Sequence, residues 1–207
     1  MTPQIHNGLV HLNGCLLASI DFETTGLRAG YHEIIQIAVV PLDANLRPST
    51  ELRPFYHHIA PEFPERADVK AGQIHGIDLD WLMMNSPSSG KVADMLVEWS
   101  DNLDLPVNRS IVPLAHNWAF ESAHGKAWLG DDLFSHLFHS HARDGMLLAV
   151  SMNDRAAFLG MPVPFHYVGL NALCTQFGIT NEHAHDALSD ARAEAEVYRS
   201  LLHHELF

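Results

Sequence analysis

The sequence predicts an α/β fold in which helices flank a mixed β-sheet. Apolar segments with the composition of strands come first in the chain, and segments with the apolar spacing of helices follow them. One more strand pattern, at residues 109–115, separates these helical segments, so strands and helices alternate in the second half. The chain has 207 residues, 47% of them hydrophobic, which is enough for one substantial core. We therefore expect a single domain over residues 1–207.

The first three expected strands lie at residues 15–22, 33–42 and 51–59. The first is a short apolar run that ends in polar residues, as in a buried strand whose end carries functional side chains. The second is rich in β-branched residues and ends beside a proline. Together the three segments predict an antiparallel meander.

Helical patterns dominate the rest of the chain. Residues 89–103, for example, place Val92 and Leu96 on one helical face. The proline-containing stretch at residues 160–166 predicts a surface loop and not a domain boundary. The other expected helices lie at residues 117–129, 144–159, 168–177 and 185–206.

The net charge of −13 argues against a wide contact with a nucleic-acid backbone, because such contacts normally need a basic face. The chain has three lysines and no run of basic residues. A nucleic-acid ligand would therefore be held over a short stretch, with metal ions supplying much of the positive charge. The 16 histidines do not predict a zinc site, because those at residues 136–141 are irregularly spaced and favour helix ends and loops.

The sequence does not predict a membrane protein. No apolar run approaches the roughly 20 residues that span a bilayer, and residues 1–12 lack the basic and apolar regions of a signal peptide. Cys15 and Cys174 flank apolar runs, which favours buried thiols over a disulfide. We therefore expect a reducing, cytoplasmic setting.

Two acidic residues stand at the end of the first expected strand. Asp21 and Glu23 are two residues apart, so both side chains point to the same face of the strand. Carboxylates held this close repel each other unless a cation or a proton lies between them. Such a pair suits Mg²⁺ or Mn²⁺, which prefer hard oxygen ligands. An ordinary exposed strand end explains the same two residues equally well.

His185 and Asp190 lie where the last expected helix begins. His185 is just ahead of the first turn or at it, and the helix carries Asp190. A histidine with an ordinary pKa of roughly 6.5 can accept a proton from water at neutral pH. The alternative is that Asp186 caps the helix, Asp190 is solvated and His185 has no role.

A further acidic residue follows the strand expected at residues 109–115. The sequence there is LAHNWAFES, at residues 114–122. Asn117 is a favourable helix N-cap. Glu121 falls in an early helical turn, where its charge also complements the helix dipole.

These segments resemble, in order, the three Exo motifs of the DnaQ-like (DEDDh) 3′→5′ exonucleases. They are IDFETTGL at residues 20–27, AHNWAFE at residues 115–121 and HDALSDA at residues 185–191. The resemblance covers about residues 16–202, nearly the whole chain. It implies a ribonuclease-H-like α/β fold and a two-metal active site that releases nucleoside monophosphates from single-stranded 3′ ends.

Carried over by position, the resemblance assigns the catalytic groups. Asp21, Glu23 and Asp190 would hold one divalent ion, and Asp21 would also bridge to the second. Glu121 would complete the carboxylate set, and His185 would be the general base. Two Mg²⁺ or Mn²⁺ ions held in this way can clamp the attacking and leaving oxygens of a phosphoryl displacement.

The resemblance also implies a pocket for the terminal nucleotide. Leu27 would pack against the last base, and Phe120 would offer an aromatic surface to it. The residues that would shape or line this pocket come from the first and second motifs: Thr24, Thr25, Gly26, Leu27, His116, Asn117 and Phe120.

Glu121 is a departure from the resemblance, because the family's second motif usually has aspartate there. The extra methylene moves the carboxylate outward by roughly 1.5 Å, and catalytic groups tolerate only about 0.5 Å of error. Either the backbone is set back to compensate, or the second ion binds less tightly, or activity is low. Our hypothesis is an active enzyme with a preference for Mn²⁺.

Two alternatives stay open. One is an RNA-trimming exonuclease like RNase T or the oligoribonucleases, although the TTG after Glu23 is closer to the proofreading type and favours DNA. The other is a catalytically weakened module that binds without cutting, which the acidic surface and the altered second motif would suit. The sequence does not identify a polymerase or repair partner, an oligomeric state or a pathway.

Overall fold

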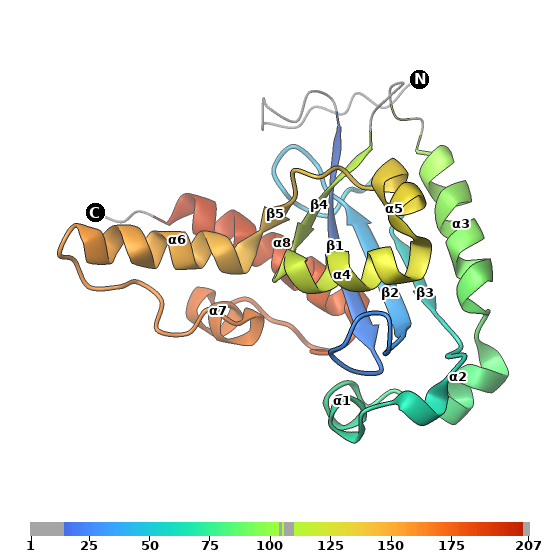
Figure 1. Ribbon diagram of the computed structural model, residues 1–207. Helices are drawn as coiled ribbons and strands as arrows, with labels where there is room; N and C mark the ends of the chain where they lie inside the picture. The colour runs from blue at the N-terminus through green and yellow to red at the C-terminus, as the bar shows by residue number, and fades with distance from the viewer. Residues whose placement is uncertain (1–14, 104, 106–109, 205–207) are drawn as a thin grey trace.

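The fold is built on a mixed β-sheet, as the sequence predicts. The computed structural model describes residues 15–103, 105 and 110–204. In this part of the chain the sheet has five strands in the order β3-β2-β1-β4-β5 (Figure 1). β1, β2 and β3 form an antiparallel meander, whereas β4 and β5 run parallel to β1. The strands are β1 (Leu16–Thr24), β2 (Ile34–Pro41), β3 (Phe55–His58), β4 (Ile111–Ala115) and β5 (Arg143–Asp144).

Helices cover both faces of this sheet. Helix α4 lies across one face, and α8 lies against the other (Figure 1). The helical elements are η2 (Pro64–Arg66), α1 (Val69–His75), α2 (Leu79–Asn85), α3 (Ser89–Asp101), α4 (Trp118–Leu129), α5 (Asp131–Leu137), α6 (Gly145–Phe158), α7 (Leu170–Phe177) and α8 (Ala187–His203).

Alternation along β1 divides its side chains between the two faces. Ile20 and Phe22 belong to a cluster that α3 and α5 complete. Leu17 belongs to the opposite cluster, where α8 contributes Ala191 and other small residues. These alanines allow α8 to pack closely on the sheet, and α6 and α7 form a further layer over it. Because side chains alternate along a strand, the face of β1 that carries Leu17 also carries its acidic residues.

The third strand is shorter than expected. It begins at Phe55, although the sequence pattern predicted a strand from residue 51. The Ser49 hydroxyl accepts hydrogen bonds from the backbone N–H groups of Glu51 and Leu52, at 3.2 and 3.0 Å. This local turn takes donors that a strand would use, and Pro54 has no N–H to offer.

Several short elements have no clear sequence pattern. Helices α1 and α2 have seven residues each, and Leu82 is the one buried residue that they contribute. A helix without a buried stripe leaves no apolar period in the sequence. Helix α5 and the two-residue strand β5 were not predicted either. The predicted helix at residues 185–206 is α8, and residues 205–207 lie outside the described part.

The structure also bears on the expectations for the cysteines and for membrane-spanning segments. Cys15 and Cys174 are free, buried thiols. Within the described residues, no helix is long and apolar enough to cross a bilayer. The expectation on residues 1–12 falls outside the described part of the chain. At the other end Leu201 is buried, whereas Leu202 remains half exposed.

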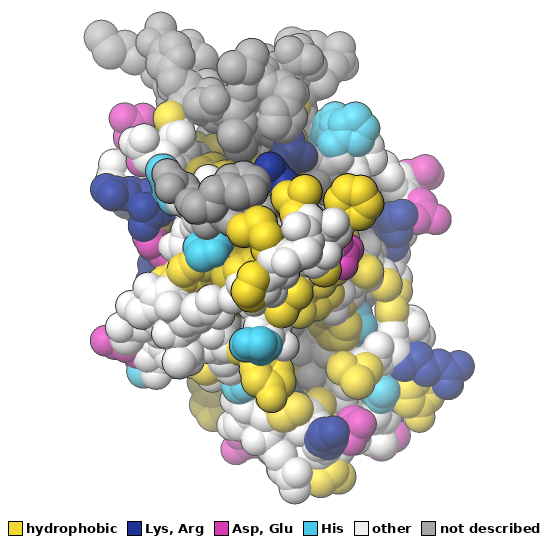
Figure 2. Space-filling view, turned by 90° about the vertical axis from the view of Figure 1, so that its left-hand side faces the viewer, with side chains coloured by type: hydrophobic (Ala, Val, Ile, Leu, Met, Phe, Trp, Pro, Cys, Tyr) yellow, Lys and Arg dark blue, Asp and Glu magenta, His cyan; other side chains and the backbone are white. Residues whose placement is uncertain are grey.

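One end of the molecule exposes apolar side chains. Phe158 is 90% exposed at the end of α6, and Leu159 and Val163 are partly exposed in the loop that follows. Figure 2 views the molecule from this side and shows hydrophobic side chains gathered on the surface. This surface is separate from the acidic residues at the end of β1.

Candidate active site

The end of β1 presents a row of polar side chains toward α8. Ser19, Asp21 and Glu23 alternate with Ile20 and Phe22, which belong to the opposite core cluster. β1 is central in the sheet, and its pairing with β2 becomes irregular between Glu23 and Thr24. The strand therefore ends with both carboxylates held by a rigid element, as the spacing predicted.

The start of α8 is hydrogen-bonded to strands β2 and β3. Asp186 is the N-cap and accepts from Ser189 N at 3.1 Å. Its other oxygen accepts from the Tyr56 hydroxyl at 2.6 Å and from the Gln36 amide at 3.0 Å. The Gln36 side chain also accepts from Ala187 N at 2.8 Å. These bonds set the position of the residue just before the cap, His185.

His185 and Asp190 meet Glu23 in one place. Each of the three offers a ligand atom, and these atoms lie within 4.8 Å of one another. His185 has a left-handed backbone (φ 68°), and its N–H donates to Asp190 Oδ2 at 3.1 Å. The other oxygen of Asp190 accepts from the Asn181 amide at 2.5 Å. Asp190 is buried, so the idea that it is a solvated residue of an ordinary helix is wrong.

Glu121, in the first turn of α4, lies near Asp21, because its charge contributes to the raised pKa of that carboxyl. Glu121 is 4% exposed, and its Oε2 atom is buried without a hydrogen-bond partner in the described part of the chain. Asp21 is a second acidic residue with a buried carboxylate oxygen, Oδ2, that has no hydrogen-bond partner among the described residues. The two unpartnered oxygens come from two different predicted motifs.

The turn between β4 and α4 differs from the expectation. Asn117 occupies the N-cap position, but its side chain makes no capping hydrogen bond. N-cap residues usually have extended backbones, whereas Asn117 is left-handed, with φ 96°. Asp144, at the end of β5, takes over the capping role: its carboxylate accepts from the N–H groups of Asn117 and Trp118 at 3.3 and 2.8 Å.

A fifth carboxylate, Glu194, lies behind these groups and was not predicted. It is 2% exposed, and it accepts from the Ser19 hydroxyl at 3.0 Å and from His116 N at 3.1 Å. It therefore joins α8 to β1 and to the end of β4. The sequence holds one signal for it: Glu194 is a charged residue among the alanines of α8, one helical turn after Asp190.

The electrostatics of the five carboxylates favour a positive ligand. Burial, and then the charges of Glu194 and other carboxylates, raise the pKa of Asp21 well above its usual range. Burial also raises the pKa of Glu23 and of Glu121 to about 8. Burial is likewise the largest cause of the raised pKa of Asp190 and Glu194. Carboxylates with these shifts hold protons until a cation replaces them.

The donor set fits divalent metal ions. Hard carboxylate oxygens are the ligands that Mg²⁺ and Mn²⁺ prefer, and an imidazole lies beside them. The unpartnered Asp21 and Glu121 oxygens are buried acceptors, which are costly to leave without a donor or a cation. A cation bound beside them would satisfy both atoms.

The turn after β1 is tightly built. The Thr24 hydroxyl donates to Gly26 O at 2.8 Å, and the Thr25 hydroxyl accepts from Glu33 N at 2.9 Å. A Cβ at Gly26 would lie 2.6 Å from the His32 ring, so this ring excludes any side chain there. Leu27, by contrast, is 82% exposed. Its exposure leaves it free to contact a ligand.

In the second motif, the polar and aromatic side chains contact other parts of the protein. His116 Nε2 lies 2.7 Å from Val168 O, so that nitrogen is engaged within the protein. Burial lowers the pKa of His116. Phe120 is partly buried, and its ring centroid lies 4.2 Å from that of His124. The roles of these residues toward a nucleotide stay predictions.

The chain belongs to the RNase T exonuclease family. The model of this family, which is described as exonuclease, matches residues 19–198. The match confirms the resemblance that the three motifs carry. A search of the curated proteins found none that matches.

Solved structures of exonucleases share the fold. Exonuclease I from Methylocaldum szegediense superposes with a TM-score of 0.67 at 21% identity, over 92% of this chain and 41% of its own. The nuclease domain of 3′hExo, a DEDDh family member bound to rAMP, gives 0.62 at 19% identity, over 91% and 92%. E. coli exonuclease I in complex with a dT13 oligonucleotide gives 0.64 at 18%, over 90% and 41%. The chain thus spans 41% of the length of both exonuclease I structures.

Proposed function

We propose that the protein is a metal-dependent 3′→5′ exonuclease that releases nucleoside monophosphates from single-stranded nucleic acid, with DNA favoured over RNA. The convergence of Glu23 on β1, His185 just before α8 and Asp190 on α8 carries the proposal, since their ligand atoms lie within 4.8 Å of one another. The family match supports a nuclease. We also propose that residues 1–207 form a single domain and that the protein is cytoplasmic.

The side chains have two roles: carboxylates hold the metal ions, and a histidine accepts a proton. Asp21, Glu23, Glu121 and Asp190 would hold two Mg²⁺ or Mn²⁺ ions, which supply charge stabilisation and an acidified water when bound. His185 accepts the proton of the attacking water, because it stands beside Glu23 and Asp190 at the start of α8. The Asn181 amide orients Asp190 through its hydrogen bond.

The residues around the β1 turn would bind the 3′-terminal nucleotide. The structured turn at Thr24, Thr25 and Gly26 offers a rigid wall, and exposed Leu27 offers an apolar contact for the last base. His116, Asn117 and Phe120 would line the opposite side of the cleft. We propose single strands because the −13 charge leaves little capacity for the backbone of a long duplex.

A 5′-labelled single strand tests the proposal. Incubation with Mn²⁺ or Mg²⁺ should give a ladder that shortens by one nucleotide at a time from the 3′ end, and EDTA should abolish it. Asp21→Ala should be inert, and a variant that degrades the strand as well as the wild type would remove the assigned site. DNA and RNA strands of one sequence test the preference, and faster RNA cleavage would reverse it.

A binding module that does not cut is the second candidate, because Glu121 replaces the family's aspartate. Such a module would bind the strand with Mn²⁺ present and give no ladder. Retention of His185 beside the carboxylates argues against it, since binding alone needs no proton acceptor.

A further inference from the structure

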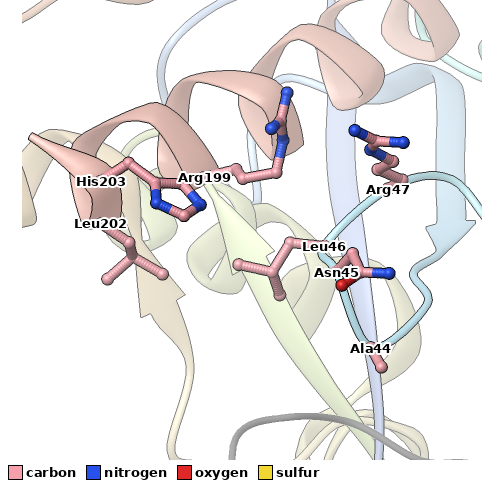
Figure 3. A pocket seen from close by; sticks show the side chains of 7 residues that line it. All are labelled: Ala44, Asn45, Leu46, Arg47, Arg199, Leu202 and His203. Carbon is pink, nitrogen blue, oxygen red and sulfur yellow. The ribbon is translucent and has the colours of Figure 1, made fainter.

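A basic pocket lies at the far end of α8 from the candidate active site. It has a volume of about 470 Å³ and lies between the loop after β2 and the last turns of α8. Figure 3 shows Arg47 and Arg199 extending from these two elements toward the same end of the pocket, with the His203 ring turned inward. The described residues that line it include no carboxylate.

This gathering of positive charge is unusual for the chain. The sequence has 12 Lys and Arg residues against 25 Asp and Glu residues. Arg199 and His203 can be explained by the negative end of the α8 dipole, which attracts cations. Arg47 lies on a different element, so the dipole does not explain why it faces the same pocket.

The loop that presents Arg47 is already rigid. The Asp43 carboxylate accepts from the N–H groups of Asn45 and Arg47 at 2.8 and 2.9 Å, and Asp43 N donates to Arg47 O at 2.8 Å. Leu46 is buried against α8 in spite of its left-handed backbone (φ 61°). A ligand would therefore meet a preformed loop and would not have to order it.

Arg199 has hydrogen-bonding capacity to spare. Glu196 pairs with one of its terminal nitrogens, and this pair orients the side chain. Its Nε atom is buried and has no hydrogen-bond partner among the described residues. A guanidinium offers five N–H donors in a planar fork, a geometry that matches the oxygens of a phosphate group.

We propose that Arg47, Arg199 and His203 form a phosphate-binding site that is separate from the catalytic carboxylates. The pocket is large enough for a mononucleotide, since small-molecule sites are roughly 300–1,000 Å³. The phosphate comes from a free mononucleotide or from the backbone of the nucleic-acid strand. Naming nucleic acid as its source rests on the proposed exonuclease function, whereas the phosphate chemistry does not.

Helix α8 connects this pocket to the candidate active site and sets the distance between them. At about 1.5 Å per residue, Asp190 and Arg199 lie about 14 Å apart along the helix, and the outermost residues, His185 and His203, lie about 27 Å apart. A strand held at both sites would need on the order of four to eight nucleotides, at roughly 3.4 Å per nucleotide. A twelve-nucleotide oligothymidylate is therefore a suitable probe.

Titration calorimetry of the full chain in EDTA tests the site with three probes: inorganic phosphate, thymidine monophosphate and the oligothymidylate. Arg47→Ala should weaken phosphate binding about tenfold, the loss expected for one charged hydrogen-bonding partner. Arg47 is exposed, so this variant should fold normally. Arg192→Ala removes the same charge from α8 outside the pocket and should bind phosphate like the wild type.

The outcomes separate the possibilities. Equal weakening by Arg47→Ala and Arg192→Ala, or no weakening by Arg47→Ala, would overturn the site. If Arg47→Ala weakens binding of the oligothymidylate, the strand is the source. If Arg47→Ala weakens binding of the monophosphate alone, the free nucleotide is the source of the phosphate. If the wild-type protein binds phosphate but cleaves no strand, the proposed function is contradicted and this site still stands.

Discussion

Glu121 is the residue whose neutralisation speaks most directly to the proposed mechanism. Its Oε2 atom is buried and has no hydrogen-bond partner among the described residues, so no contact in the fold uses that oxygen. We expect Glu121→Gln to lower kcat by roughly 100-fold, the loss typical of removing one electrostatic contributor from a catalytic centre. Single-turnover cleavage of a labelled strand measures it, and a variant as fast as the wild type would refute the role.

Glu121→Asp is the matched control, since it keeps the charge and shortens the side chain. If the backbone of α4 is adapted to glutamate, this variant should lie between the wild type and Glu121→Gln. If aspartate raises activity, the glutamate is instead a handicap that the backbone does not offset.

At Glu194 we predict that hydrogen bonding matters more than charge. Glu194→Gln can still accept from His116 N and can donate to the Ser19 hydroxyl. Glu194→Ala leaves the partly buried His116 N–H without this partner, at a cost of about 1–3 kcal/mol. We expect urea denaturation in EDTA to show that loss for the alanine variant alone. Equal destabilisation by both variants would show that the charge is what the fold requires.

The sequence predicts the carboxylates on β1, α4 and α8 but not the residues that support them. Asp21 and Glu23 were predicted because a period of two places both on one strand face. Glu194 was missed because a glutamate in a helix is usually solvated, and only its alanine neighbours hint otherwise. Asn181 was missed as well, because it lies in a loop with no period to locate it.

At the scale of the element, the start of α8 depends on β2 and β3. The Tyr56 hydroxyl and the Gln36 amide both bind the Asp186 carboxylate, one residue after His185. We expect Tyr56→Phe to lower kcat by about 10-fold and to leave Mn²⁺ affinity unchanged, because it loosens the turn that carries the proton acceptor. Steady-state kinetics and calorimetry together measure this. A loss confined to Mn²⁺ affinity would place Tyr56 with the metal ligands instead.

Elements with a strong apolar period were predictable, and short ones were not. β1, β2, α3 and α8 each bury one face or both, so their periods are visible in the sequence. The residues between β3 and α3 fold into short helices with little burial, held by local caps such as Asp68 and Asp78. A cap of this kind identifies a turn but does not by itself predict a helix.

At the scale of the whole molecule, stability should depend on pH and metal together. Burial raises the pKa of Glu23 and Glu121 from 4.5 to about 8, so the folded state binds these protons more tightly than the unfolded state. The free energy of unfolding of the metal-free protein should therefore fall as pH rises from about 4.5 to about 8, and then level off.

Thermal melts with EDTA and with Mn²⁺ across this pH range check the prediction. In EDTA, Tm should decrease toward the higher pH. With Mn²⁺ the decrease should shrink or reverse, because the ions replace the protons on the same carboxylates. A metal-free Tm that rises between about pH 5 and pH 8 would contradict the raised pKa values.

Asp144 has a mechanical consequence for this arrangement. Besides capping α4 through Asn117 and Trp118, its carboxylate accepts from Leu147 N at 3.0 Å and is the N-cap of α6. One side chain thus anchors the starting turns of two helices, which cannot shift independently while it is in place. A contact that shifts the start of α6 would therefore act on the same carboxylate that caps the helix bearing Glu121, which gives a binding event on α6 a physical route to the candidate active site.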